Sequence, residues 1–372
     1  MQFDTKNFRL HFSSSSSFLL DIIRLFSAQY IVLVHHCTLW KYVEPHKLGM
    51  MKDIGAIALA GFFVHSGYLI AWSTFRRQKN EPLYGFREFF TDRLVRVYIA
   101  LIPCMVVLVL VTLLGYALVQ KPIAAVGLRD TIGTLLMLEN NPLLEQMRYY
   151  FQSDDGSWLF VKNYAGALPL WTLVIEWWIY MAFGWWILVK QKRKWWYWPL
   201  LLFFLIEPAW QTFVGNRLGP GLPIFWLLGV VLVFMLESAW MKNRTRNVLL
   251  SLAGFIAMFP LFLLLGWKMA ALSYFIFVSF AVLALNNSTL KPPRQLDAVV
   301  RFGAGYTLTL YILHYPMAKL FSLLPTGWSA GTEIVISILA INIVSILVAL
   351  PSELKYKHYR KKLYRRLGWQ HA

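Results

Sequence analysis

The chain contains ten apolar runs that are each long enough to cross a membrane as a helix. At about 1.5 Å per residue, roughly twenty helical residues match the ~30 Å hydrocarbon core of a bilayer. Inside a bilayer, a helix also satisfies its own backbone hydrogen bonds. The runs cover about 20–40, 54–75, 97–120, 167–189, 195–213, 220–238, 248–266, 269–286, 303–324 and 333–352. We therefore predict an all-α fold, a polytopic integral membrane helical bundle with about ten transmembrane helices.

The positive charge of the chain is explained by membrane topology. The formal net charge is +18, but the basic residues lie in short clusters between the apolar runs. With ten spans, 26 of the 36 Lys and Arg residues fall on the side that carries both termini. Cytoplasmic loops are enriched in Lys and Arg. We therefore predict an integral protein of the plasma (inner) membrane with both termini cytoplasmic, whose partner is the lipid bilayer and not nucleic acid.

The chain divides by composition into three parts. Residues 1–19 include a run of five serines and are predicted to be a cytoplasmic N-terminal tail. Residues 20–352 form the membrane domain, in which the segment 121–166 is too polar to span and is predicted to be extracytoplasmic. Residues 353–372 form a basic cytoplasmic tail. The first apolar run lacks a small-residue cleavage site and is interpreted as a retained span.

The first apolar run, LDIIRLFSAQYIVLVHHC, carries ionisable residues inside the membrane. Arg24 and His35 are eleven residues apart, which places them on one helix face and about 16 Å apart along the axis. Such residues normally face a cavity or a partner and are functional candidates. The alternative is a packed histidine and an arginine that extends to the interface. The adjacent His36 points about 100° away from His35.

Other spans carry the remaining ionisable candidates. They are His65, Glu176 and His314, each in a different apolar run. Imidazole is a natural general base near neutral pH, and a buried carboxylate can orient it. Histidines on several spans could also ligate zinc, but no span has two ligands at i, i+4 spacing, so we expect no metal. Cys37 and Cys104 both lie in spans and indicate no disulfide framework.

A basic stretch follows the second span. Arg93 and Arg96 are three residues apart and share one face if the segment is helical. Positive-inside topology and lipid head groups would explain them. A clamp for a polyphosphate ligand that arrives from the cytoplasm would also explain them, because guanidinium groups match phosphate geometry.

Five segments, in order along about 20–320, resemble the acyltransferase family 3 integral membrane proteins. The first segment matches the family's L-D-x-x-R opening, with ten residues between its arginine and its histidine. The others resemble F-F-x-x-S-G-[FY]-L-I, a basic segment before span three, W-S-L-x-x-E-x-x-[FY] and Y-S-L-Y-L-x-H-x-P. In this chain the five segments read LDIIRLFSAQYIVLVHH, GFFVHSGYLIAW, RLVRVY, LWTLVIEWWIYM and GYTLTLYILHYP.

The chain departs from the family pattern at three places. Ile22 and Leu25 replace the glycines usual beside the first arginine, and His65 replaces an aliphatic residue. His65 either serves this protein's acceptor or is simply packed. The basic segment has Arg-x-x-Arg spacing, where a closer pair is often described. Some members append a hydrolase-like domain, and we interpret this chain as a stand-alone form.

The resemblance implies a transferase that moves an acyl group, commonly acetyl, from cytoplasmic acyl-CoA to a hydroxyl of a cell-surface or lipid-linked carbohydrate. Acyl-CoA is then a donor substrate, and no cofactor is expected to stay bound. His35 either deprotonates the acceptor or is transiently acylated, while Glu176 and His314 orient the site. Arg24, Arg93 and Arg96 hold phosphates, and the remaining candidates for substrate binding are Ser66, Trp171 and His65.

Two other classes of protein remain open. A transporter or flippase could move a polar lipid or glycan through the same polar cavity without covalent chemistry, because intramembrane His and Glu also serve proton relays. A membrane scaffold could use the same residues only to lock its helices together. Labelled acyl-CoA offered together with candidate glycans separates the three classes.

Overall fold

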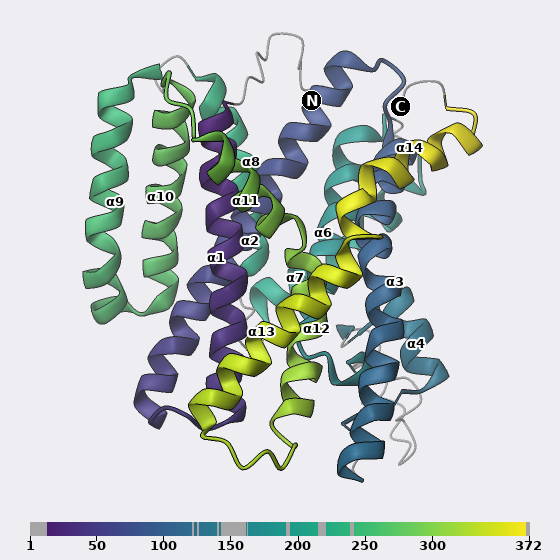
Figure 1. Ribbon diagram of the computed structural model, residues 1–372. Coiled ribbons are helices and arrows are strands. Elements are labelled where there is room, and N and C mark those ends of the chain that lie inside the picture. The colour runs from purple at the N-terminus through teal and green to yellow at the C-terminus, as the bar shows by residue number, and fades with distance from the viewer. Residues whose placement is uncertain are drawn as a thin grey trace. The chain divides into compact units, whose positions relative to one another are not determined.

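The computed structural model describes residues 13–120, 123–124, 126–139, 141–142, 161, 163–190, 194–214, 221–238 and 242–369. These residues form helices joined by short turns, and no strand occurs among them (Figure 1). The predicted all-α class is confirmed for this part of the chain. Asp154, Asp155 and the rest of 143–160 lie outside the described residues.

Each of the ten apolar runs coincides with helix. The elements are α1 Ser14–Leu39, α2 Pro45–Asn80, α3 Phe86–Val119, α4 Leu128–Leu135, η2 Tyr164–Gly166, α6 Leu170–Leu188, α7 Tyr197–Phe213, α8 Leu222–Glu237, α9 Arg244–Leu265, α10 Trp267–Asn286, α11 Arg294–Gly305, α12 Thr307–Phe321, α13 Ala330–Ala349, η4 Glu353–Lys355 and α14 Tyr356–Arg366.

Among the described residues, six helices are long and apolar enough to cross a membrane, and a seventh span results if α11 and α12 form one broken span. The six include α1, α2, α3, α9 and α10, together with the helical run Ala330–Arg366 that contains α13. Residues Leu222–Leu236 form a shorter apolar helix. The protein is therefore built from membrane-spanning helices, and the full number of ten spans stays a prediction.

The helices form two compact units. One comprises residues 1–34, 44–84 and 224–307, and the other comprises 35–43, 85–223 and 308–372. Helix α1 contributes its longer N-terminal part to the first unit and its last residues, from His35, to the second.

In the first unit, glycines allow α2 and α8 to cross with their backbones in contact. A Cβ on Gly67 of α2 would lie 1.9 Å from the carbonyl oxygen of Trp226, and one on Gly229 of α8 would lie 2.0 Å from that of Val64. Gly61, six residues before Gly67, instead faces the ring of Tyr274 on α10. Such close approach is possible only without side chains at these positions.

The serine run at the N-terminus is the first turn of α1, and its polar groups contact α10. The Ser16 hydroxyl donates to the Val282 carbonyl at 3.0 Å, and the Ser13 backbone N–H donates to Asn286 Oδ1 at 2.8 Å. Ser16 is fully buried. Helix α1 therefore begins at Ser14, inside the segment 1–19 that was predicted as an N-terminal tail, and the Ser16 hydroxyl satisfies a carbonyl of a neighbouring helix.

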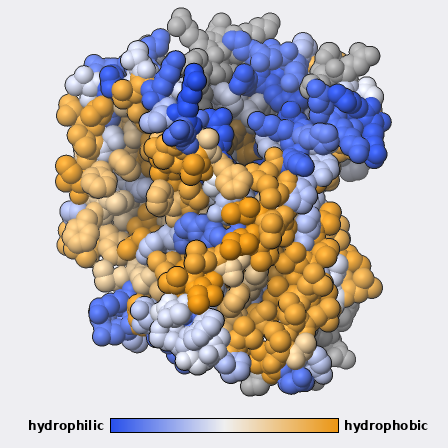
Figure 2. All heavy atoms as spheres, viewed as in Figure 1, coloured by the Kyte–Doolittle hydropathy of each residue, from blue (hydrophilic) through white to orange (hydrophobic). Residues whose placement is uncertain are grey.

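In the second unit, α3 has one exposed apolar face and one buried face. Ile102, Val106, Leu110 and Leu113 follow one another at helical spacing and are each at least half exposed. Cys104 and others on the opposite face are fully buried. Apolar side chains dominate the visible surface along α13 and the lower part of α3 (Figure 2). Such a stripe on a spanning helix suits contact with lipid.

The polar segment after α3 folds back along that helix. Gly115 near the end of α3 faces Ile123, and the hydroxyl of Tyr98 donates to the Leu135 carbonyl. Tyr98 and Gly115 are 17 residues apart, so the returning segment follows α3 for about 25 Å. Its end also bonds to α6, where Trp178 Nε1 donates to the Met137 carbonyl at 2.8 Å. The described part of 121–166 is thus packed structure, and its extracytoplasmic position stays a prediction.

The C-terminal segment is folded onto the start of α3. The Tyr364 hydroxyl of α14 donates to Asp92 at 2.9 Å, and Arg360 lies 3.9 Å from the same buried carboxylate. Arg87 of α3 lies over the Trp369 ring. Hydrophilic side chains cover α14, at the upper right of Figure 2. Within the predicted tail 353–372, residues 353–366 are therefore mostly helical, and the segment packs on α3 as far as Trp369.

Candidate active site

Three aromatic side chains meet at the end of α1 in the second unit. The ring centroids of His35 and His314 are 5.2 Å apart with planes at 42°, and the Tyr315 ring meets His35 edge-on at 5.2 Å. His314 is fully buried, whereas His35 is partly exposed. His35 is thus the more accessible member of the pair, and α12 supplies the His314 and Tyr315 rings that it meets.

The hydrogen bond of His314 fixes its tautomer when the ring is neutral. Its Nδ1 lies 3.2 Å from the carbonyl oxygen of Leu310, one turn earlier on α12. A carbonyl only accepts, so Nδ1 carries the proton and Nε2 carries the lone pair. Nε2 is buried with no hydrogen-bond partner in the part of the chain that the structure describes. A buried, unpartnered acceptor is costly unless a ligand or water meets it.

A second polar pair connects α12 to α6. The hydroxyls of Thr172 and Tyr311 are 2.8 Å apart, and the Tyr311 ring lies 5.8 Å from the His314 ring. Glu176, one turn after Thr172, accepts a hydrogen bond from the Tyr180 hydroxyl. Glu176 is partly exposed, as is Trp171 in the first turn of α6.

His36 occupies a different environment from His35. It is fully buried, its Nε2 lies 3.0 Å from the Ser337 hydroxyl of α13, and its ring stacks on Trp40 at 5.4 Å. Trp40 in turn donates from Nε1 to Glu333 at 2.6 Å. These contacts connect the end of α1 to α13. His36 therefore packs against Trp40 and is within hydrogen-bond distance of Ser337.

The two arginines of the basic stretch differ in what they contact. Arg93 lies over the Phe89 ring at 5.4 Å, and its Nε has no hydrogen-bond partner among the described residues. Arg96 pairs with the buried carboxylate of Glu353 at 3.3 Å and lies over the Tyr356 ring at 4.7 Å. Both are partly exposed. Of the two arginines, only Arg96 pairs with a carboxylate among the described residues.

Arg24 belongs to the first unit, where it meets the end of α11. Its Nε donates to the Thr307 hydroxyl at 2.9 Å, and its Nη2 donates to the Ala304 carbonyl. The last carbonyls of a helix lack intrahelical donors and carry partial negative charge, so a guanidinium there is stabilising.

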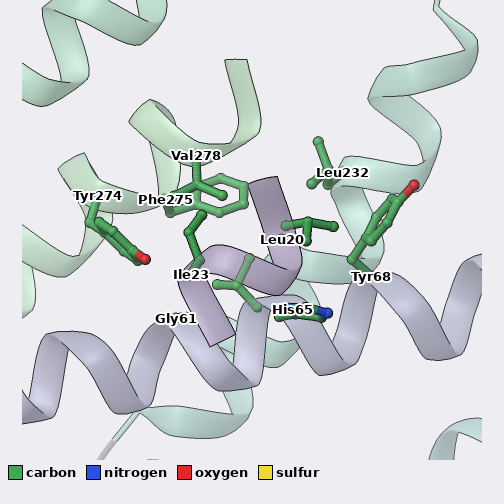
Figure 3. Close-up of a pocket in the computed structure, with 10 residues that line it drawn as sticks. Leu20, Ile23, Gly61, His65, Tyr68, Leu232, Tyr274, Phe275 and Val278 are labelled. Carbon is green, nitrogen blue, oxygen red and sulfur yellow. The ribbon is translucent and has the colours of Figure 1, made fainter. Parts of the chain in front are cut away.

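His65 of α2 lines a small cavity within the first unit (Figure 3). The cavity has a volume of about 10 Å³, which is the space of one water molecule. His65 is buried and its Nδ1 has no hydrogen-bond partner among the described residues. The adjacent Ser66 is partly exposed. The other side chains around the cavity are apolar or aromatic: Leu20, Ile23, Val64, Tyr68, Leu232, Tyr274, Phe275 and Val278. The surroundings are those of a packed histidine.

The structure thus brings together some of the predicted residues. His35 and His314 touch, and α6 places Glu176 in the same unit. Arg24, His65 and Ser66 belong to the other unit. Tyr311 and Tyr315 were not selected. Tyr311 is three residues before His314, and this helical spacing could have indicated a shared face, whereas Tyr315 directly follows His314 and gives no such signal. Among the described residues, no group of three His, Cys, Asp or Glu side chains is arranged to hold a metal.

Comparison with protein families shows to which family the chain belongs. The acyltransferase domain of family 3 matches residues 19–350. The chain belongs to acyltransferase family 3. The match covers every predicted site residue and the helices from α2 to α13, and it ends before η4 and α14. No curated protein and no solved structure matches the chain. Together with its spanning helices, membership makes this protein a membrane acyltransferase.

Proposed function

We propose that this membrane acyltransferase moves an acyl group, commonly acetyl, from cytoplasmic acyl-CoA to a hydroxyl of a cell-surface or lipid-linked carbohydrate. The observation that carries the proposal is the partly exposed His35 packed against the buried His314 within an acyltransferase domain. An imidazole with an accessible edge suits the removal of a proton from an alcohol, the step that O-acyl transfer requires.

In the proposed reaction, His35 in its neutral form accepts the proton of the acceptor hydroxyl as the oxygen attacks the thioester carbonyl. The new C–O ester bond forms and the C–S bond breaks. The CoA sulfur leaves as a thiolate and takes the proton back from the His35 imidazolium. General-base help of this kind typically contributes 10²- to 10⁴-fold. Transient acylation of His35 itself is the second route to the same products.

His314 and its neighbours are assigned to orientation. The Leu310 carbonyl holds the proton on His314 Nδ1, so Nε2 is available to accept a hydrogen bond. The Thr172–Tyr311 pair joins α12 to α6, and the Tyr311 ring lies 5.8 Å from the His314 ring. Glu176 lies on α6, one turn after Thr172. Glu176 then either balances positive charge that forms on imidazole or binds the acceptor. Trp171 offers an apolar ring for a sugar face.

We assign the three arginines to the binding of acyl-CoA, the acyl donor. Acyl-CoA is a polyanion, and guanidinium groups bind phosphate with two parallel hydrogen bonds. Arg93, with an unpartnered Nε, is the leading phosphate ligand, and Arg96 lies one turn away on α3. Arg24 lies on α1, eleven residues before His35, and the same helix therefore carries a cation and the proposed base on one face.

Transfer of label is the test of the proposal. Purified protein is incubated with acetyl-CoA labelled in its acetyl group and with a panel of carbohydrate acceptors, and both ester product and released thiol are quantified. Equal amounts of labelled ester and free thiol support transfer to a hydroxyl. Movement of a glycan across vesicles without ester formation would instead support the transporter reading, and neither activity would favour a scaffold.

A further inference from the structure

Glu353 is a buried carboxylate between α13 and α14, in the segment that the sequence analysis predicts to be a basic cytoplasmic tail. Its side chain is fully buried. A buried carboxylate is costly unless it is paired and hydrogen-bonded. All of its partners described here lie within the second unit, on α3 and α12.

One oxygen of Glu353 binds the start of α12. Glu353 Oε2 accepts from the Thr309 backbone N–H at 2.9 Å and from the Thr309 hydroxyl at 2.8 Å. Thr309 is the third residue of α12, and the first four N–H groups of a helix have no intrahelical acceptor. Negative charge at this end of a helix is stabilising. Glu353 therefore caps the helix that carries Tyr311 and His314.

The other oxygen of Glu353 binds a donor-side cation. Arg96 Nη2 lies 3.3 Å from Glu353 Oε1, and its guanidinium lies over the ring of Tyr356, three residues further along the chain. The Arg96 side chain is 27% exposed, so one edge of the guanidinium can meet a ligand while another holds the carboxylate. One carboxylate thus joins the basic stretch of α3 to the N-terminus of α12.

We propose that Glu353 is a positioning residue that couples donor binding at Arg96 to the placement of His314. The inference rests on the proposed function, and it assigns a task to the C-terminal segment. The carboxylate orients the Arg96 guanidinium toward the donor phosphates and holds the first turn of α12, and so holds the partner ring of His35. The segment 353–356 is then part of the catalytic unit.

Cys104 supplies a readout that does not depend on activity. Its sulfur lies 4.0 Å from the Thr309 carbonyl, and its side chain is fully buried. A shift of the first turn of α12 uncovers this thiol. The other cysteine, Cys37, is removed as Cys37→Ala so that labelling by a maleimide reports on Cys104 alone.

The experiment compares Glu353→Gln with Arg96→Gln in this background. Glu353→Gln removes the charge from both contacts, so we expect at least a tenfold fall in kcat, a rise in the KM for acetyl-CoA and at least fivefold faster labelling of Cys104. Arg96→Gln leaves the Thr309 contacts in place, so KM rises while Cys104 stays as protected as in the parent. The double variant should lose no more than Glu353→Gln, because coupled residues are not additive.

The matched control is Glu44→Gln, which removes the same charge from an exposed pair with Lys47 and should change neither kcat nor labelling. The proposal is overturned if folded, monodisperse Glu353→Gln protein keeps kcat and KM within twofold of the parent. It is also overturned if Cys104 labels at the parent rate. If the parent transfers no acyl group, the proposed function fails, and the labelling contrast still decides whether Glu353 positions α12.

Discussion

The imidazole rings of His35 and His314 pack against each other with centroids 5.2 Å apart. One ring comes from the end of α1 and the other from the middle of α12, so the contact joins a helix near the start of the chain to one near its end. His35 is the partly exposed ring and His314 the buried one. The proposed division of work, with His35 as the base and His314 as its orienting partner, follows from this difference in exposure.

Arg93 provides the cleaner test of the donor site. We expect Arg93→Gln to weaken acetyl-CoA binding by about 10- to 150-fold, the effect of losing a charge-assisted contact of about 1.5–3 kcal/mol. Binding is measured by calorimetry on detergent-purified protein. Arg76→Gln, which removes the charge of an exposed arginine on α2, is the control. An unchanged donor affinity in Arg93→Gln would remove this residue from the site.

Arg96 behaves differently in such an experiment because it also neutralises Glu353. We expect Arg96→Ala to lower the free energy of unfolding by a few kcal/mol, since a buried carboxylate is left without its cation. Thermal unfolding of Arg96→Ala beside Arg93→Ala checks the contrast. Equal melting temperatures for the two variants would show that the Glu353 pair contributes nothing to stability.

Glu139 predicts a pH dependence for the segment that returns along α3. Burial raises the pKa of Glu139 from its usual 4.5 to about 7, against the opposing hydrogen bonds from the Thr134 hydroxyl and the Tyr164 N–H. Between these two pH values, the folded protein holds a proton that the unfolded chain releases. The contribution of Glu139 to stability is therefore complete below about pH 4.5 and is lost as the pH rises through about 7.

The measurement compares the parent with Glu139→Gln at pH 5 and pH 8. The parent should lose more thermal stability than the variant on going to pH 8, by an amount on the order of 3 kcal/mol at most. The variant has no proton to release at this position, and it controls for every other titrating group. Parallel stability curves for the two proteins would contradict the assignment.

The topology is tested across a single helix. Lys47 and Lys79 are exposed near opposite ends of α2, an unbroken helix of 36 residues, and are about 48 Å apart along its axis. In a variant without Cys37 and Cys104, we expect Lys47→Cys to react with an impermeant reagent from outside the cell and Lys79→Cys to react only after permeabilisation. Reaction of both from the same side would contradict the predicted orientation.

The sequence predicted the helices because their signal is local. Runs of about twenty apolar residues leave helix as the only structure that satisfies the backbone in lipid, and each run is helical here. Helical geometry also predicted that the adjacent side chains of His35 and His36 point in different directions. By contrast, the site of Glu353 depends on a contact with Thr309, 44 residues earlier, which composition does not encode.

Two segments were assigned by composition, and the structure gives each a packed position. The basic C-terminus has few apolar residues, yet Asp92 and the ring of Trp369 hold it on α3. The polar segment after α3 returns along that helix because its backbone carbonyls accept from Tyr98 and Trp178. Both arrangements depend on a few contacts with residues far away in sequence, and a pattern of hydropathy does not show them.

The central claim is that His35, and not His36, removes the proton from the acceptor. His35 is partly exposed, whereas His36 is buried and hydrogen-bonded to Ser337 of α13. Both variants, His35→Ala and His36→Ala, must first be shown to be monodisperse and to bind acetyl-CoA, because truncation of either ring removes packing.

Single-turnover transfer from labelled acetyl-CoA then measures the chemical step alone. We expect His35→Ala to slow transfer by about 10²- to 10⁴-fold with little change in donor affinity. His36→Ala should keep a rate within about tenfold of the parent. A folded His35→Ala protein that transfers the acetyl group at the parent rate would contradict the account.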